Sequence, residues 1–212
     1  GGSLRLPATH SGIFALKRSL GRVPVNPPFI GRVTGPMTRS VAASAAMMCL
    51  LSKPDARDFM SLPYDAENYS DLEGLDPKKL RIGFLPDMKV GLPVHPEVRA
   101  AAKAAADALA GAGAKVEEMP TFLTPELLDG MCRFFEAPSF NDYMMLSPAK
   151  QAKVLPFIVE WCTWRAKNFR GRDVMVAYNC YVMMREAATR ATQPYDFVIS
   201  PTSPIVPYEA EL

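Results

Sequence analysis

Two spacings of apolar residues follow one another in the middle of the chain. The short apolar runs at 80–85 and 115–119 are strand-like, and the segment 95–110 between them carries apolar residues at helical spacing. A strand, a helix and a strand in this order predict a βαβ unit over 80–119 with parallel strands. The unit has neither a GxGxxG nor a GxxxxGK[ST] motif, so we interpret it as scaffold.

Helical spacing continues over 124–192, with prolines marking the expected boundaries. Thr124 is a predicted N-cap, a helix is expected to end at Pro138, and Pro156 is expected to kink or break the next one. The apolar run at 195–200 predicts a further strand, which leads into a proline-rich loop.

An aromatic stripe lies within this helical region. Its members, at helical spacing, are Phe157, Trp161 and Trp164. Packing in the core is the favoured interpretation, and the wall of an acyl or aryl pocket is the alternative.

The first quarter of the chain mixes short apolar steps with loops. Residues 4–6 alternate between apolar and polar side chains and are followed by a proline, which is typical of a short strand. Ser11-Gly12 predicts a turn into an apolar run. A helix is predicted over 37–51, opened by Pro36 in its first turn.

Composition narrows the function classes. The 212 residues are 49% hydrophobic and 22% charged, which is typical of a globular protein. The net charge of +2 argues for neither nucleic acid nor an anionic membrane as partner, and no apolar run reaches the length of a membrane span. With only His10 and His95, the chain is poor in metal ligands, and we expect no metal or other cofactor.

The cysteines do not form a recognisable framework. Their spacing fits neither a zinc site nor a disulfide scaffold, and we expect buried free thiols in a cytoplasmic protein. The four residues are Cys49, Cys132, Cys162 and Cys180.

The chemistry-bearing stretch is the start of the chain, Gly1-Gly2-Ser3. Glycine backbone can adopt positive φ and approach a ligand closely. Successive N–H groups there can converge on one developing negative oxygen, next to a serine that can act as nucleophile. The chain has no GxSxG motif and only two histidines, which makes a Ser-His-Asp hydrolase a poor fit.

The residues that follow match a longer pattern in register. Arg5, Pro7, Ala8, Gly12, Ile13, Leu16, Lys17 and the run Gly21-Arg22-Val23-Pro24 all match. In this, the chain resembles the nucleophile segment of the amidase signature family. The stretches 31–39, 53–63 and 195–207 also resemble that family, whereas His10, Arg18 and Ala43 depart from it, Ala43 replacing an acid that we take to be structural.

The resemblance implies a fold and a site. The fold class is α/β, an amidase-signature-type mixed β-sheet flanked by helices and incomplete at both ends. Residues 1–212 form one partial domain, with the nucleophile segment at 1–24, the βαβ scaffold at 80–119, the helical region at 124–192 and a strand at 195–200. Ser3 corresponds to the nucleophile, and the backbone N–H groups of Gly1, Gly2 and Ser3 to the oxyanion hole.

The same resemblance implies a Ser, cis-Ser, Lys triad whose lysine and cis-serine precede Gly1. Lys17 belongs to another part of the motif and is not assigned as the base. We therefore expect amide hydrolysis through an acyl-serine in the full-length parent, and no activity in this chain alone. The expected partner is a small-molecule amide rather than nucleic acid or membrane, and a homodimer stays open.

Two alternatives remain at this stage. One is the amidase subunit of a tRNA-dependent transamidation complex. The other is a non-catalytic α/β binding or assembly module whose Gly-Gly-Ser comes from an expression vector. The enzyme hypothesis predicts that residues 4–13 pack into the domain beside a cleft, and the vector hypothesis predicts a disordered Ser3.

Overall fold

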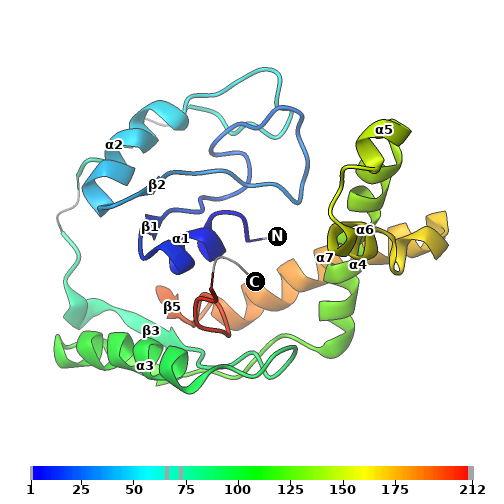
Figure 1. The fold of residues 1–212 in the computed structure, drawn as a ribbon. Coiled ribbons are helices and arrows are strands. Elements are labelled where there is room, and N and C mark those ends of the chain that lie inside the picture. Colours follow the sequence, from blue (N-terminus) through cyan, green and yellow to red (C-terminus); the bar gives the residue numbers. More distant parts are fainter. Residues whose placement is uncertain (1, 65–66, 72–73, 210–212) are drawn as a thin grey trace. The chain divides into compact units, whose positions relative to one another are not determined.

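The computed structural model describes residues 2–64, 67–71 and 74–209 (Figure 1). The chain divides into two compact units. The first comprises 1–79, 94–104 and 201–212, and the second comprises 80–93 and 105–200. Helix α3 (Pro96–Gly111) begins in the first unit and ends in the second.

The first unit is built around a small antiparallel sheet. Strand β1 (Phe14–Ala15) pairs with β2 (Met37–Thr38), so that Phe14 lies opposite Thr38. Helix α1 (Arg5–Ser11) precedes this sheet, and α2 (Val41–Leu51) follows it. The core includes Ala8, Ala45 and the fully buried Met48. A short 3₁₀ turn, η1 (Pro77–Lys79), completes the described part of 1–79.

The second unit contains the parallel sheet. Strand β3 (Arg81–Phe84) lies in the centre, between β4 (Lys115–Glu118) and β5 (Phe197–Ile199), and both pairings are parallel. Ile82 and Leu85 are almost completely buried, as expected for a central strand. The predicted parallel pair is thus confirmed, and the fold is a mixed α/β fold with a parallel sheet flanked by helices.

Two long helices form the rest of the second unit. Helix α4 (Pro125–Met144) packs against α7 (Gly171–Thr192). A Cβ at Gly130 of α4 would overlap the side chain of Cys180 on α7, so the helices can approach this closely only with glycine there. Shorter helical segments connect them: α5 (Pro148–Gln151), α6 (Pro156–Thr163) and the 3₁₀ turn η2 (Ala166–Asn168) (Figure 1).

Several predicted boundaries are correct. Thr124 caps α4, and its Oγ1 accepts the N–H of Leu127 at 3.3 Å. The chain breaks before Pro156, which becomes the first residue of α6. Ser11-Gly12 forms the expected turn, because Gly12 adopts a left-handed conformation at the end of α1.

Two local predictions are wrong. Residues 4–6 do not form a strand, since α1 begins at Arg5; Pro7 lies in the first turn, where a missing N–H removes no helical bond. The helix predicted over 37–51 begins only at Val41, because Met37 pairs with Ala15 and the Ser40 hydroxyl caps the helix by accepting the N–H of Ala43.

The prediction that Pro138 ends a helix is also wrong. Helix α4 continues through Pro138 to Met144. Helix α4 packs against α7, and the Ser139 hydroxyl donates to the Phe135 carbonyl at 2.7 Å beside the interruption. Tertiary contacts therefore outweigh the loss of one helical hydrogen bond.

Burial corrects two further expectations. Cys49 and Cys132 are exposed, although Cys162 is buried and all four thiols are free. The aromatic stripe is not core either, since Phe157, Trp161 and Trp164 are 63%, 52% and 65% exposed. For the aromatic residues, helical spacing correctly predicts that they share one face of α6, but another face of that helix is the one that packs.

A buried carboxylate ties two loops of the first unit together. Asp58 is 4% exposed, and its two oxygens accept the N–H groups of Val25 and Met60, each at 2.9 Å. Because an unsatisfied buried donor is costly, this one side chain fixes the loop that follows Pro24.

We expect Asp58→Ala to lower the free energy of unfolding by about 1–3 kcal/mol for each N–H left unsatisfied. Asp58→Asn should also destabilise, because its NH₂ group would face one of the two donors. Urea unfolding followed by circular dichroism measures both. The matched control is Glu67→Gln, which removes an exposed carboxylate in the same unit and should change little. Equal effects at the two positions would contradict a bracing role for Asp58.

Candidate active site

Ser3 lies at the turn that leads into α1. Ser3 is exposed, and the turn precedes Arg5, the first residue of the helix. Gly2 has a φ of 90°, and a Cβ there would be 2.8 Å from Cδ1 of Leu6. The positive φ therefore favours glycine immediately before the serine, and a larger residue there would also have to displace the Leu6 side chain. Gly1, the third member of the predicted oxyanion hole, lies outside the described residues.

The hydrogen bonds of this turn leave donors near the serine. The Leu6 N–H donates to the Gly2 carbonyl at 2.9 Å, and the Ala8 N–H donates to the Leu4 carbonyl at 3.2 Å. Among the described residues, no acceptor lies within hydrogen-bond reach of the N–H groups of Gly2 and Ser3. These two groups are thus available to an oxygen that approaches the turn.

The end of α1 is anchored in the first unit. Ala8 is 4% exposed, and its carbonyl accepts the N–H of Ile13 at 3.0 Å. Beyond β1, the Leu16 N–H donates to the carbonyl of the fully buried Pro36 at 3.1 Å. Ala8 is the buried residue of the segment 4–13, most of which is exposed, so the expected packing of this segment beside a cleft stays a prediction.

Three basic residues, Arg5, Lys17 and Arg18, lie in or beside this segment. Partial burial, followed by the positive charge of Arg5, lowers the pKa of Lys17 from its ordinary value near 10.5. Sequence reasoning assigned Lys17 to the motif but did not identify this environment, because the interaction between positions 5 and 17 depends on the turn at Gly12. Arg18, one of the departures from the family pattern, lies over the ring of Tyr69, 5.0 Å from its centroid.

A hydroxyl cluster at the start of α2 also escaped sequence analysis. The Thr38 hydroxyl donates to the Ser40 carbonyl at 2.8 Å and lies 2.7 Å from the hydroxyl of Ser44, which is 1% exposed. The sequence gives little signal for this cluster, because Arg39 and Ser40 between Thr38 and the apolar run are polar as well. The cluster orients the corner between β2 and α2.

His10 lies near the end of α1 and contacts the returning chain. Its ring makes an edge-to-face contact with Tyr208, with 4.8 Å between centroids. The other histidine, His95, begins the segment before α3, where its N–H donates to the Pro204 carbonyl at 2.8 Å. Within the described ranges, no group of three or more His, Cys, Asp or Glu side chains is placed to hold a metal ion.

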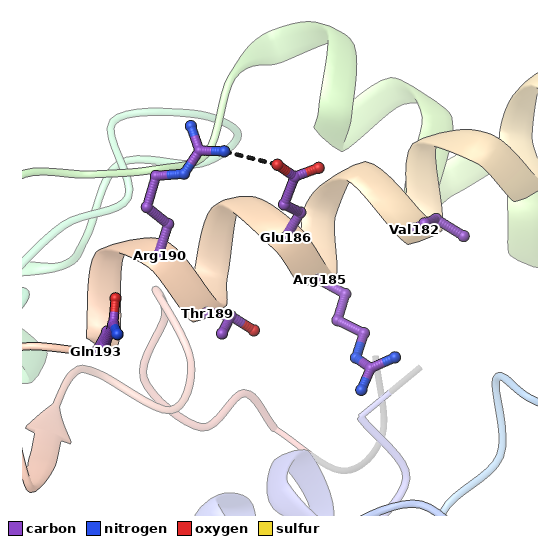
Figure 2. Close-up of a pocket in the computed structure, with 6 residues that line it drawn as sticks. All are labelled: Val182, Arg185, Glu186, Thr189, Arg190 and Gln193. Atoms are coloured by element: carbon purple, nitrogen blue, oxygen red, sulfur yellow. Dashed lines mark hydrogen bonds and ion pairs between the residues drawn. The ribbon is translucent and has the colours of Figure 1, made fainter.

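A shallow hollow runs along α7 in the second unit. Figure 2 shows its lining residues, which all come from that helix and its cap: Val182, Arg185, Glu186, Thr189, Arg190 and Gln193. Glu186 and Arg190 form an ion pair at 2.6 Å, which fits the solvated face predicted for this part of the helix. None of the predicted site residues lines this hollow, so it is not a candidate for the proposed chemistry.

Comparison with known proteins points to one family. The Amidase family model matches residues 1–211. An acylamidase of Rhodococcus erythropolis is 30% identical over 209 residues, which cover 95% of this chain and 43% of that protein. A glutamyl-tRNA(Gln) amidotransferase subunit of Staphylococcus saprophyticus is 37% identical over 127 residues, covering 56% of this chain and 25% of that protein.

The fold agrees with this assignment. A crystal structure of a bacterial aryl acylamidase of the amidase signature family superposes with a TM-score of 0.83 at 22% identity, over 99% of this chain and 45% of that chain. The corresponding glutamyl-tRNA(Gln) amidotransferase structure from Thermotoga maritima gives a TM-score of 0.67 at 16% identity, over 100% of this chain and 47% of that chain. The chain thus spans less than half the length of these relatives.

The lowered pKa of Lys17 predicts early reaction with amine reagents. A lowered pKa gives a larger neutral fraction at any pH below it, so acetylation of Lys17 should rise at lower pH than acetylation of Nα-acetyl-lysine amide. Mass spectrometry of peptides labelled at a series of pH values measures this.

The variant Arg5→Gln should raise the pKa of Lys17 only part of the way to its ordinary value, because burial is the larger cause of the lowering. Arg39→Gln removes an equal charge from an exposed site in the same unit and should leave the Lys17 profile unchanged. A Lys17 profile equal to that of the free amine would contradict the partly buried environment.

Proposed function

Since this chain belongs to the amidase signature family, we propose that Ser3 is the nucleophile of an amide-hydrolysing enzyme. The observation that carries the proposal is the position of Ser3 at an exposed turn directly after a positive-φ glycine, within a matched motif. The family match begins at residue 1, which supports a native Gly-Gly-Ser rather than a vector-derived one.

The proposed chemistry has two steps. The Ser3 hydroxyl attacks the amide carbonyl while a base takes its proton, and the negative charge moves to the carbonyl oxygen. The C–N bond then breaks, the amine leaves with a proton from the base, and an ester on Ser3 remains. Water attacks this ester in the second step, which releases the acid and restores the serine.

The backbone at the turn supplies the oxyanion stabilisation in this proposal. The N–H groups of Gly2 and Ser3 have no acceptor among the described residues and can donate to the oxygen that becomes negative. One such donor is typically worth about 10²–10³ in kcat. The positive φ of Gly2 directs this stretch of backbone, so the glycine is part of the proposed site as well as of the fold.

The proposed base is a lysine that this chain does not supply. In the family pattern, the lysine and the cis-serine that relays the proton both precede Gly-Gly-Ser. A desolvated lysine can be neutral at moderate pH and accept the serine proton. Lys17 has a lowered pKa but follows the nucleophile in the motif, so we assign it to the surroundings of α1.

We propose a small linear amide as substrate, because similar structures include an aryl acylamidase. The amidotransferase relatives favour a second candidate function. The Staphylococcus saprophyticus protein is 37% identical over its matched residues, whereas the acylamidase is 30% identical over a longer match. In that case the amidase would supply ammonia within a tRNA-dependent complex. Co-purification of companion subunits with the longer protein, and glutaminase activity that depends on them, would favour this second function.

The nucleophile assignment is testable with a fluorophosphonate probe and an anilide substrate. A longer protein that carries the upstream lysine and cis-serine should be labelled and should turn over the anilide. Ser3→Ala should abolish labelling and lower kcat by at least about a thousandfold. Ser19→Ala is the matched control, since it removes an exposed hydroxyl in the same unit and should leave both signals intact.

The same assay on the 212-residue chain tests where the base lies. We expect no labelling and only residual turnover, because oxyanion donors alone can retain about 10³-fold over water. Full, Ser3-dependent turnover by this chain would contradict an upstream base and would leave the nucleophile assignment standing. Labelling of the longer protein that survives Ser3→Ala would instead overturn the nucleophile.

A further inference from the structure

The aromatic stripe of α6 is exposed on the surface of the second unit. Phe157, Trp161 and Trp164 follow one another at intervals of four and three residues, so they share one side of the helix. All three are more than half exposed, while Cys162 on another side is 6% exposed. Helix α6 therefore packs on α4 with one face and leaves its aromatic face uncovered within this chain.

Aliphatic side chains extend this apolar surface along the chain. Leu155 immediately before α6 is 59% exposed, and Ile158 within it is 37% exposed. Met145 at the end of α4 is 78% exposed. The Gln151 side chain donates to the Tyr143 carbonyl at 3.1 Å, which joins α5 to the end of α4. Large exposed apolar surfaces of this kind are typical of interaction sites.

The stripe is held in position by an ion cluster that is centred on the buried Glu136. Arg165, directly after Trp164, donates from Nε and Nη2 to the two carboxylate oxygens of Glu136 at 3.0 and 2.7 Å, and its Nη1 pairs with Asp129. Glu136 is 8% exposed, and the Arg165 guanidinium lies 5.2 Å from the Trp164 ring centroid. The bidentate pair fixes the end of α6 on α4, so the exposed rings are presented on a rigid support.

Positive charge flanks the stripe on both sides. Residues 148–172 contain six Lys or Arg and one Glu, a net charge of +5, whereas the remaining residues carry 18 basic and 21 acidic side chains, a net of −3. Four exposed cations of this segment form no ion pair with another described residue: Lys150, Lys153, Lys167 and Arg172. The overall charge of +2 therefore hides a strongly basic segment.

We propose that the α6 stripe and its basic flanks bind an anionic lipid surface. In this arrangement α6 lies in the plane of the interface, with the aromatic and aliphatic side chains among the acyl chains and the cations at the headgroups. The long cationic side chains can reach the headgroups from the flanks. The segment does not cross the bilayer, since none of the described helices is long and apolar enough to do so.

Charge and side-chain type favour this partner over two others. A second copy of the chain would bring two sets of exposed, unpaired cations together, which opposes association through this face. A single-stranded nucleic acid would stack on the aromatic rings but would find no stacking partner in Leu155, Ile158 or Met145. An anionic bilayer accommodates all three kinds of side chain.

Intrinsic fluorescence provides a site-specific test, because the only two tryptophans of the chain, Trp161 and Trp164, both belong to the stripe. Vesicles of phosphatidylcholine with phosphatidylglycerol should shift the tryptophan emission to shorter wavelength and sediment the 212-residue chain. Brominated acyl chains should quench the emission. Pure phosphatidylcholine vesicles and high salt should weaken all three effects.

Two variants separate the apolar and the electrostatic contributions. Phe157→Ser with Ile158→Ser should reduce vesicle binding while both fluorophores remain. Lys150→Glu with Lys153→Glu should reduce the partition coefficient by about tenfold or more, on the basis of about 1 kcal/mol for each cation near the surface. The matched control is Lys78→Glu with Lys79→Glu, an equal charge change at exposed lysines in the other unit, which should have little effect.

Three results would overturn the proposal. The first is no emission shift and no sedimentation with anionic vesicles. The second is a shift that depends only on protein concentration, which would indicate a second copy on this face. The third is a shift produced by polyuridylate and not by vesicles, which would indicate nucleic acid. Circular dichroism of every variant distinguishes loss of binding from loss of folding.

Discussion

A backbone conformation that strongly favours glycine determines how the candidate nucleophile is presented. Gly2 has a φ of 90°, and the space beside it is occupied by the side chain of Leu6. An L side chain there would be strained at this φ and would have to displace the Leu6 side chain, so the turn before Ser3 favours a residue without a Cβ. This turn leaves the N–H groups of Gly2 and Ser3 without an acceptor among the described residues. It also exposes Ser3 and leads directly into α1.

The first unit anchors that turn through backbone contacts rather than a large apolar core. Ile13 is tied to Ala8, and Leu16 is tied to Pro36. Farther along the chain, the buried Asp58 carboxylate joins the loop after Pro24 to the loop that contains Met60. These bonds connect the end of α1, the short strands and the loops of the first unit, and each of them is costly to leave unmade.

The second unit combines a conventional parallel sheet with an unusual distribution of apolar surface. Ile82 and Leu85 are buried in the central strand region, yet both tryptophans of the chain are more than half exposed. The Arg165 cluster explains how exposed rings can be held in place, because its carboxylate partners lie on α4 and Glu136 is buried. The surrounding positive charge indicates what kind of surface such rings would meet.

The amino-acid sequence alone determined the family, the parallel β3–β4 pair, the cap at Thr124 and the identity of the candidate nucleophile, because these depend on local spacing and on motif residues in register. Only the tertiary structure decided that residues 5–11 form a helix, that α4 continues through Pro138, and that the aromatic face of α6 points outward. Periodicity shows which residues share a face but not which face finds a packing partner, and proline limits a helix only where no neighbouring element compensates. The environment of Lys17 likewise arises from an interaction with Arg5 across the turn at Gly12, and the sequence carries no signal for an interaction of that kind.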